Sequence, residues 1–179
     1  VAMPHLEQLV EQVHESSSVS ELDGDDVIYI ARVPTKRIMT VTISVGTRFP
    51  AYATSMGRVL LAAQSDERLD DYLESASLRG LTGHTITSAT ALRRELRKIR
   101  SQGWALVDQE LEEGLRSIAA PIRDADGQVI AAINVSTHAG RRSLNSIVEE
   151  LLQPLLATAR RIELDLARSR ASVRARPDA

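Results

Sequence analysis

Two apolar segments separated by an Asp-Gly turn constrain the fold more than any other feature of this sequence. Residues 115–123 and 128–136 have strand composition, and the turn between them reads Asp124-Ala125-Asp126-Gly127. An Asp-Gly pair between two such segments is a strong hairpin signal, because a tight turn needs backbone angles that these residues tolerate. Hairpin strands are antiparallel, so the sequence predicts an antiparallel sheet.

The other elements alternate between groups of strands and groups of helices. Apolar spacing and caps predict helices over 4–18, 55–63, 66–75, 88–101 and from 143 onwards, the last kinked or broken at Pro154. Further strands are expected over 19–22, 27–33, 38–45 and 104–109, and residues 85–87 look extended. Because no repeated strand–helix–strand unit appears, the order predicts an α+β fold with a mainly antiparallel sheet flanked by helices.

Composition excludes several classes of function. The chain has 179 residues, a formal net charge of −2, no cysteine and 3% aromatic residues. A domain that binds DNA by itself carries an excess of basic residues. Disulfides and thiol catalysis need cysteine. No segment has the apolar length of a membrane span and no signal peptide is visible, so we expect a cytoplasmic protein without membrane contact.

The loop over residues 46–58 is the first candidate site. A proline-containing segment leads into small residues at a predicted helix start, where free amides bind anions. Under the functional interpretation, the amides of Ser55 to Gly57 cradle a carboxylate and the Ser55 hydroxyl adds a donor. Under the alternative interpretation, Thr54 and Ser55 only cap a tightly packed helix. The spacing of the residues alone favours this alternative interpretation.

Two further segments carry polar groups. The acidic segment 107–117 could supply paired carboxylates for acid–base work or form a solvated turn, and Arg116 could anchor an ion pair or point outward. Asn134 and Ser136 alternate onto one face of a strand, where they suit a ligand lying on the sheet or form a polar outer face. Catalysis has little support, because Ser55 lacks the Gly-x-Ser-x-Gly frame and the four histidines lack metal-ligand spacing.

Three ordered blocks resemble the effector-binding domain of the IclR family of bacterial transcription regulators: GTRFPAYATSMGRVLLA, GWALVDQELEEGLRSIAAPIRD and AAINVSTH. The phrases TSMGRVLLA and VDQELEEGLRSIA resemble most the branch that regulates aromatic-acid and β-ketoadipate catabolism. The resemblance implies a GAF-like fold with a curved sheet. It divides the chain into the end of a linker helix (1–18), the effector-binding domain (19–167) and a disordered basic tail (168–179).

The same resemblance implies a function and a site. It implies a non-enzymatic sensor without cofactor or metal, assembled as a homodimer or homotetramer, which reaches DNA only through an N-terminal winged helix-turn-helix missing from this chain. A small acid, aromatic or like β-ketoadipate, is the expected effector. The implied ligand contacts are Ser55, Met56, Gly57, Val107 or its neighbour Asp108, Ser117, Asn134 and Ser136, with apolar walls from Val41, Phe49 and Leu115.

Two other functions stay open from the sequence. A small hydrolase-like enzyme could use Ser55 or the acidic segment, and it would consume a ligand that a sensor returns unchanged. A pure oligomerisation module could use the first and last helices as interfaces, and no metabolite would then raise its melting temperature.

Overall fold

Six antiparallel strands form the centre of the structure, a computed structural model that describes residues 1–35 and 43–174. In chain order they are β1 (Ser16–Asp23), β2 (Asp26–Val33), β3 (Arg48–Pro50), β4 (Ala105–Asp108), β5 (Leu115–Arg123) and β6 (Val129–His138). Their order across the sheet is β3-β2-β1-β6-β5-β4. The β5–β6 hairpin closes through the Asp-Gly turn, where Gly127 has a φ of 79°. The α+β and antiparallel predictions are confirmed.

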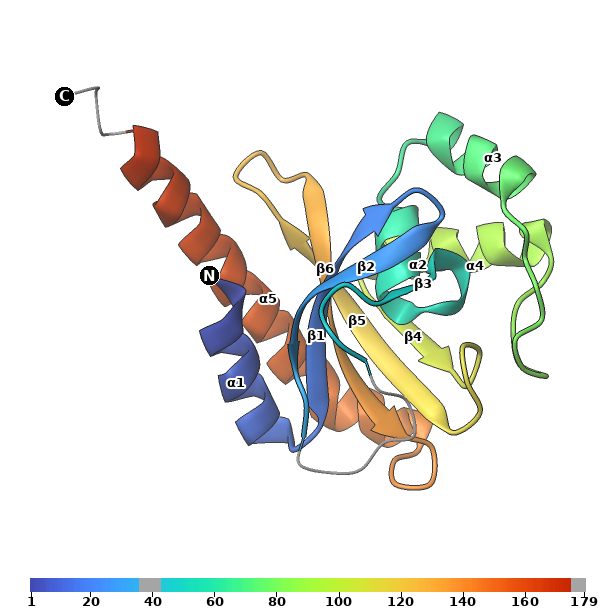
Figure 1. Cartoon of the computed structure of the whole chain (residues 1–179), viewed down its shortest axis with the longest axis horizontal. Helices are drawn as coiled ribbons and strands as arrows, with labels where there is room; N and C mark the ends of the chain where they lie inside the picture. Colours follow the sequence, from blue (N-terminus) through green and yellow to red (C-terminus); the bar gives the residue numbers. More distant parts are fainter. Residues whose placement is uncertain (36–42, 175–179) are drawn as a thin grey trace.

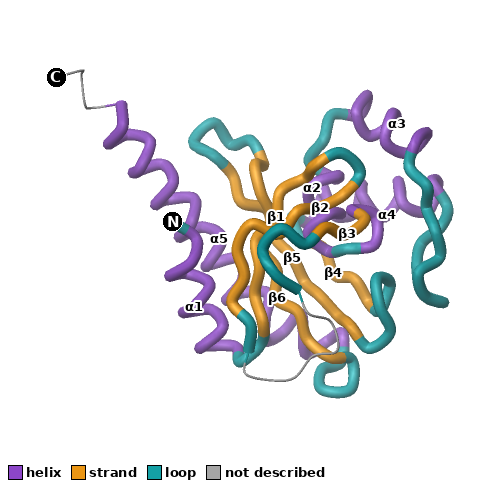
Figure 2. Tube along the Cα trace, viewed as in Figure 1, coloured by secondary structure: helices purple, strands orange, loops and turns teal. Residues whose placement is uncertain are grey.

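Helices cover both faces of the curved sheet (Figures 1 and 2). One face carries α1 (Ala2–Val13) and α5 (Leu144–Arg174), and the other carries η1 (Ala51–Ala53), α2 (Ser55–Ala62), α3 (Asp66–Ser75) and α4 (Ala89–Gln102). Side chains alternate between the two faces of the sheet along each strand, so each face has its own aliphatic core. In β5, Ile118 and Ala120 face α1 and α5, whereas Ala119 faces α2.

A bulge in β2 changes which residues share a face. Val19 of β1 pairs with Ala31, but the next residue, Ser20, pairs with Tyr29, so Ile30 is left without a partner. Residues three apart on a regular strand point to opposite faces. The extra residue instead brings Tyr29 and Arg32 onto the same face, the one that α2 covers.

Four predicted segments differ from the structure. The serines at 16–18 begin β1 and do not end the first helix, because β1 pairs with both β2 and β6 there and buries them. Helix α5 continues through Pro154 without the break that was one of the two expected outcomes, and residues 168–174, expected to belong to a disordered tail, are helical. The predicted strand 38–45 is wrong for residues 43–45, and residues 38–42 lie outside the described part. Residues 48–50, expected to be an irregular link, form β3.

Candidate functional site

Four small polar side chains meet where the start of α2 lies over β5 and β6. Ser117 and Ser136 are directly paired across these strands, and Asn134 lies two residues before Ser136 on the same face. The Asn134 amide nitrogen donates to the hydroxyls of Ser117 (3.1 Å) and Ser136 (3.0 Å). The Ser117 oxygen lies 2.5 Å from that of Ser55, the first residue of α2. We call Ser55, Ser117, Asn134 and Ser136 the polar cluster.

The residues of the polar cluster have different roles, because their hydrogen bonds differ. The side-chain oxygen of Asn134 accepts the backbone N–H of Ser18 at 3.0 Å, and both of its N–H groups are used by serines. Asn134 therefore has no donor left and holds the cluster together. The Ser136 hydroxyl accepts from Asn134 and has no acceptor of its own among the described residues, so its proton is free to donate to a ligand.

The polar cluster forms one end of a small cavity. The remaining wall is mostly apolar and consists of Tyr29, Ile43, Ala53, Thr54, Val107, Leu111 and Leu115. The space open to the centre of a water-sized sphere is about 20 Å³, room for about one water molecule. A ligand the size of a benzoate therefore enters only when lining side chains move apart.

The start of α2 combines a cap with a partly free anion site. The Thr54 hydroxyl accepts the N–H of Gly57 at 3.1 Å, so that amide is not available to a carboxylate. The amides of Ser55 and Met56 have no acceptor in the described part of the chain. A β-carbon on Gly57 would lie 2.2 Å from the carbonyl oxygen of Ala51. The absence of a β-carbon at Gly57 therefore leaves room for the η1 backbone.

The structure brings some predicted site residues together and separates others. Of the expected contacts, Ser55, Val107, Leu115, Ser117, Asn134 and Ser136 line the cavity. Met56 is fully buried in the core, where its sulfur accepts from Ser20. Phe49 lies behind the wall and packs edge-on against Tyr29, with ring centres 5.6 Å apart. Val41 lies outside the described residues.

Asp108 belongs to an ion pair and not to the cavity wall. Alternation on β4 turns Val107 towards the cavity, whereas Asp108 accepts from Arg116 at 2.6 Å. Arg116 also donates to the carbonyls of Ala139 and Arg142. The hydrogen bond from Arg116 holds the pKa of the Asp108 carboxyl below its usual value. Arg116 therefore anchors a half-buried ion pair, one of the two roles that the sequence left open.

Sequence reasoning missed a buried ion pair beside the site. Arg58 of α2 is 1% exposed and its guanidinium meets both carboxylate oxygens of Glu110, at 2.8 and 2.5 Å. Arg58 also donates to the Tyr52 carbonyl, and Glu110 accepts the N–H of Ile86. The acidic turn is thus fixed to α2 and is not a solvated loop. Nothing in the spacing distinguished Glu110 from its acidic neighbours.

Tyr29 is a second residue that the sequence did not single out. It lines the cavity from β2, is 4% exposed, and its hydroxyl has no hydrogen-bond partner among the described residues. Burial raises the pKa of this hydroxyl to about 12. The phenol therefore stays protonated at neutral pH and can donate a hydrogen bond.

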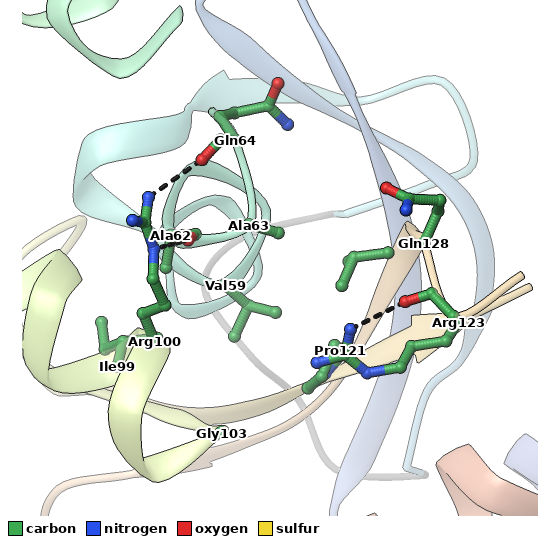
Figure 3. A pocket seen from close by; sticks show the side chains of 12 residues that line it. Val59, Ala62, Ala63, Gln64, Ile99, Arg100, Gly103, Pro121, Arg123 and Gln128 are labelled. Carbon is green, nitrogen blue, oxygen red and sulfur yellow. Dashed lines mark hydrogen bonds between the residues drawn. The ribbon is translucent and has the colours of Figure 1, made fainter. Parts of the chain in front are cut away.

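A larger groove lies elsewhere, between the ends of α2 and α4 and the β5–β6 hairpin (Figure 3). Its volume is about 380 Å³, but its charged groups are engaged. Arg100 donates to the carbonyls of Ala62 and Gln64 and to Asp66, and so caps the C-terminal end of α2. Arg123 donates to the Gly127 carbonyl within the hairpin. The groove therefore offers little unpaired charge to a ligand.

The described lining of the cavity consists of neutral side chains. Ser55 has another serine as its only side-chain partner in residues 1–35 and 43–174, so no base lies in position to activate it. The described residues include no group of three or more His, Cys, Asp or Glu that could hold a metal ion. No described helix is both long and apolar enough to cross a membrane.

The fold and the cavity define a small-molecule-binding domain in which an antiparallel sheet and a helix start enclose the ligand space. Residues 1–164 match the family described as the C-terminal domain of the bacterial transcriptional regulator IclR, and the chain belongs to this family.

Relatives and solved structures agree with this assignment. The Pca regulon regulatory protein of Pseudomonas putida is 49% identical over 160 residues, 89% of this chain and 55% of that protein. A structure from Rhodococcus sp. RHA1 shares 56% identity with a TM-score of 0.91, covering 93% of this chain and 66% of that one. A double mutant of the PobR inducer-binding domain from Acinetobacter, in complex with 3-hydroxybenzoic acid, shares 30% identity with a TM-score of 0.85, covering 90% of this chain and 95% of that one.

These comparisons confirm the resemblance seen in the sequence, including the curved antiparallel fold that it implied. The chain spans about half the length of the Pseudomonas relative.

Proposed function

We propose that this cavity binds a small carboxylic acid, either aromatic or like β-ketoadipate, and that binding controls a DNA-binding part of the regulator outside this chain. The observation that carries the proposal is the cavity itself, in which hydroxyl and amide donors gather at one end of an otherwise apolar space. Such a space suits an apolar body with one anionic group. The complex of the PobR domain with 3-hydroxybenzoic acid supports the same ligand class.

The hydrogen-bond donors at one end of the cavity support a position for the carboxylate. Its oxygens would lie between the free amides of Ser55 and Met56 and the hydroxyls of Ser117 and Ser136, with the apolar body against Val107 and Leu115. Helix-start amides and hydroxyls together hold an anion without a metal or cofactor. A regulator of this kind would work as a homodimer or homotetramer in the cytoplasm, where its DNA is.

A ligand screen tests the proposal. Protocatechuate, 4-hydroxybenzoate, 3-hydroxybenzoate, β-ketoadipate and cis,cis-muconate are added to the protein and the melting temperature is measured. A ligand at 100 times its Kd stabilises the folded state by about 2.7 kcal/mol. If no acid raises the melting temperature, the proposal is wrong. If an acid is consumed, the domain is an enzyme.

One variant checks the location of the site. Ser136→Ala removes a free hydroxyl donor, and loss of one hydrogen bond to a charged group costs about 1.5–3 kcal/mol. Calorimetry should therefore show binding of the acid weakened about 10–100-fold. Ser101→Ala, at an exposed position of α4, is the matched control and should bind normally. Equal affinities in the two variants would remove Ser136 from the site.

A further inference from the structure

Arg32 of β2 carries a positive charge that has no carboxylate partner in the described part of the chain. It is half-buried, and its one recorded hydrogen bond goes to the Ser18 hydroxyl at 3.0 Å. No described carboxylate forms a salt bridge with it, and residues 36–42, which lie outside the described part, contain no Asp or Glu. Burial lowers the pKa of this guanidinium. A cation removed from water usually has an anionic partner.

Arg32 lies in line with the polar cluster. It pairs directly with Ser18 of β1, and Ser18 pairs directly with Asn134 of β6. Directly paired residues of antiparallel strands point to the same face. At a strand spacing of roughly 4.8 Å, the backbone of Arg32 lies about 10 Å from that of Asn134, a gap that an arginine side chain largely spans.

Hydrogen bonds already connect the two positions. The Arg32 guanidinium donates to the Ser18 hydroxyl, and the Ser18 N–H donates to the Asn134 side chain. Arg32 has five N–H donors and uses one of them within the described residues. Arg32 lies on the face of the sheet that carries the cavity, where the polar cluster supplies neutral donors only.

We propose that Arg32 supplies the counter-charge for the carboxylate of the effector and thereby selects acids over neutral analogues of the same shape. This inference rests on the proposed function, because it assumes that the cavity binds an acid. The inference adds a positively charged side chain to the site, whereas the site predicted from the sequence had none. Opening of the cavity on binding would bring the carboxylate and the guanidinium together.

The test compares an acid with its neutral amide. Binding of 3-hydroxybenzoate and 3-hydroxybenzamide is measured by calorimetry for the unaltered protein, Arg32→Gln and Arg32→Lys. Arg32→Gln should weaken binding of the acid about 10–100-fold and binding of the amide far less. Arg32→Lys keeps the charge and should retain part of the preference for the acid.

A matched control is Arg123→Gln, on the same sheet but at the open groove. It should bind both compounds like the unaltered protein, and the melting temperature of each variant reports that it is folded. If Arg32→Gln weakens acid and amide equally, or neither, Arg32 is not the counter-ion. If the unaltered protein binds none of the screened acids, the proposed function fails and this assignment fails with it.

Discussion

Replacing Glu110 by glutamine tests whether a buried ion pair holds the cavity wall in place. Glu110 binds the guanidinium of Arg58 through both carboxylate oxygens and also accepts the N–H of Ile86. The turn that contains Glu110 continues into Leu111, which lines the cavity, while Arg58 lies on the helix that begins at Ser55. The pair therefore couples two parts of the site.

The expected cost follows from the burial of Arg58. The variant leaves a guanidinium that is 1% exposed opposite a neutral amide. Breaking a buried pair by removing one partner costs about 3–5 kcal/mol, because the remaining charge stays out of water. For a domain of this size, each 1 kcal/mol lowers the melting temperature by roughly 2–4 °C. We expect a decrease of about 6–20 °C and weaker binding of the effector.

Urea unfolding at a fixed protein concentration measures the effect as a change in the free energy of unfolding. Glu113→Gln, at an exposed position of the same turn, is the matched control and should change stability by less than about 0.5 kcal/mol. Arg58→Met combined with Glu110→Leu should cost less than the sum of the single changes. A loss below about 1 kcal/mol for Glu110→Gln would refute the reasoning.

Two further predictions follow from the packing and the charges. Gly57→Ala should destabilise the domain by about 1–3 kcal/mol or prevent folding, because its β-carbon would overlap backbone atoms of η1. Gly83→Ala, which meets no atom within 4 Å, should be close to neutral in the same unfolding assay, and equal effects would contradict the steric argument. The lowered pKa of Asp108 means that its pair with Arg116 stabilises the fold above the unfolded pKa of about 3.9 and is lost as the pH falls through the lower folded pKa. Asp108→Asn should therefore reduce stability at neutral pH and flatten its decline in acid, and an unchanged curve would show that the pair contributes nothing.

Local sequence patterns determined most of the elements of this protein. The Asp-Gly turn identified the β5–β6 hairpin, and serine caps identified the starts of α3 and α4. The alternation of Asn134 and Ser136 placed both on one face of β6, which the structure confirms. These features depend on neighbouring residues alone, so one sequence suffices to find them.

The outcome at the serines 16–18 shows where local patterns fail. Three small polar residues suggest the end of a helix, yet they form β1 between two partner strands that satisfy their backbone groups and bury them. One partner, β2, follows β1 across a short turn, whereas the other, β6, lies far away in the sequence. No local propensity contains that information, because tertiary pairing overrides it.

The sequence thus determined the antiparallel α+β fold and several residues that line the candidate site, whereas the tertiary structure decided how these residues are arranged. Only the folded chain shows that the η1 backbone fills the space where a side chain at position 57 would lie. Likewise, only the folded chain shows that Glu110, among several acidic residues, is the one buried against Arg58. The bulge at Ile30 brings Arg32 to the face of Tyr29, although regular alternation would place them on opposite faces. The physical reason is the same in each case: burial and charge pairing depend on contacts between distant segments.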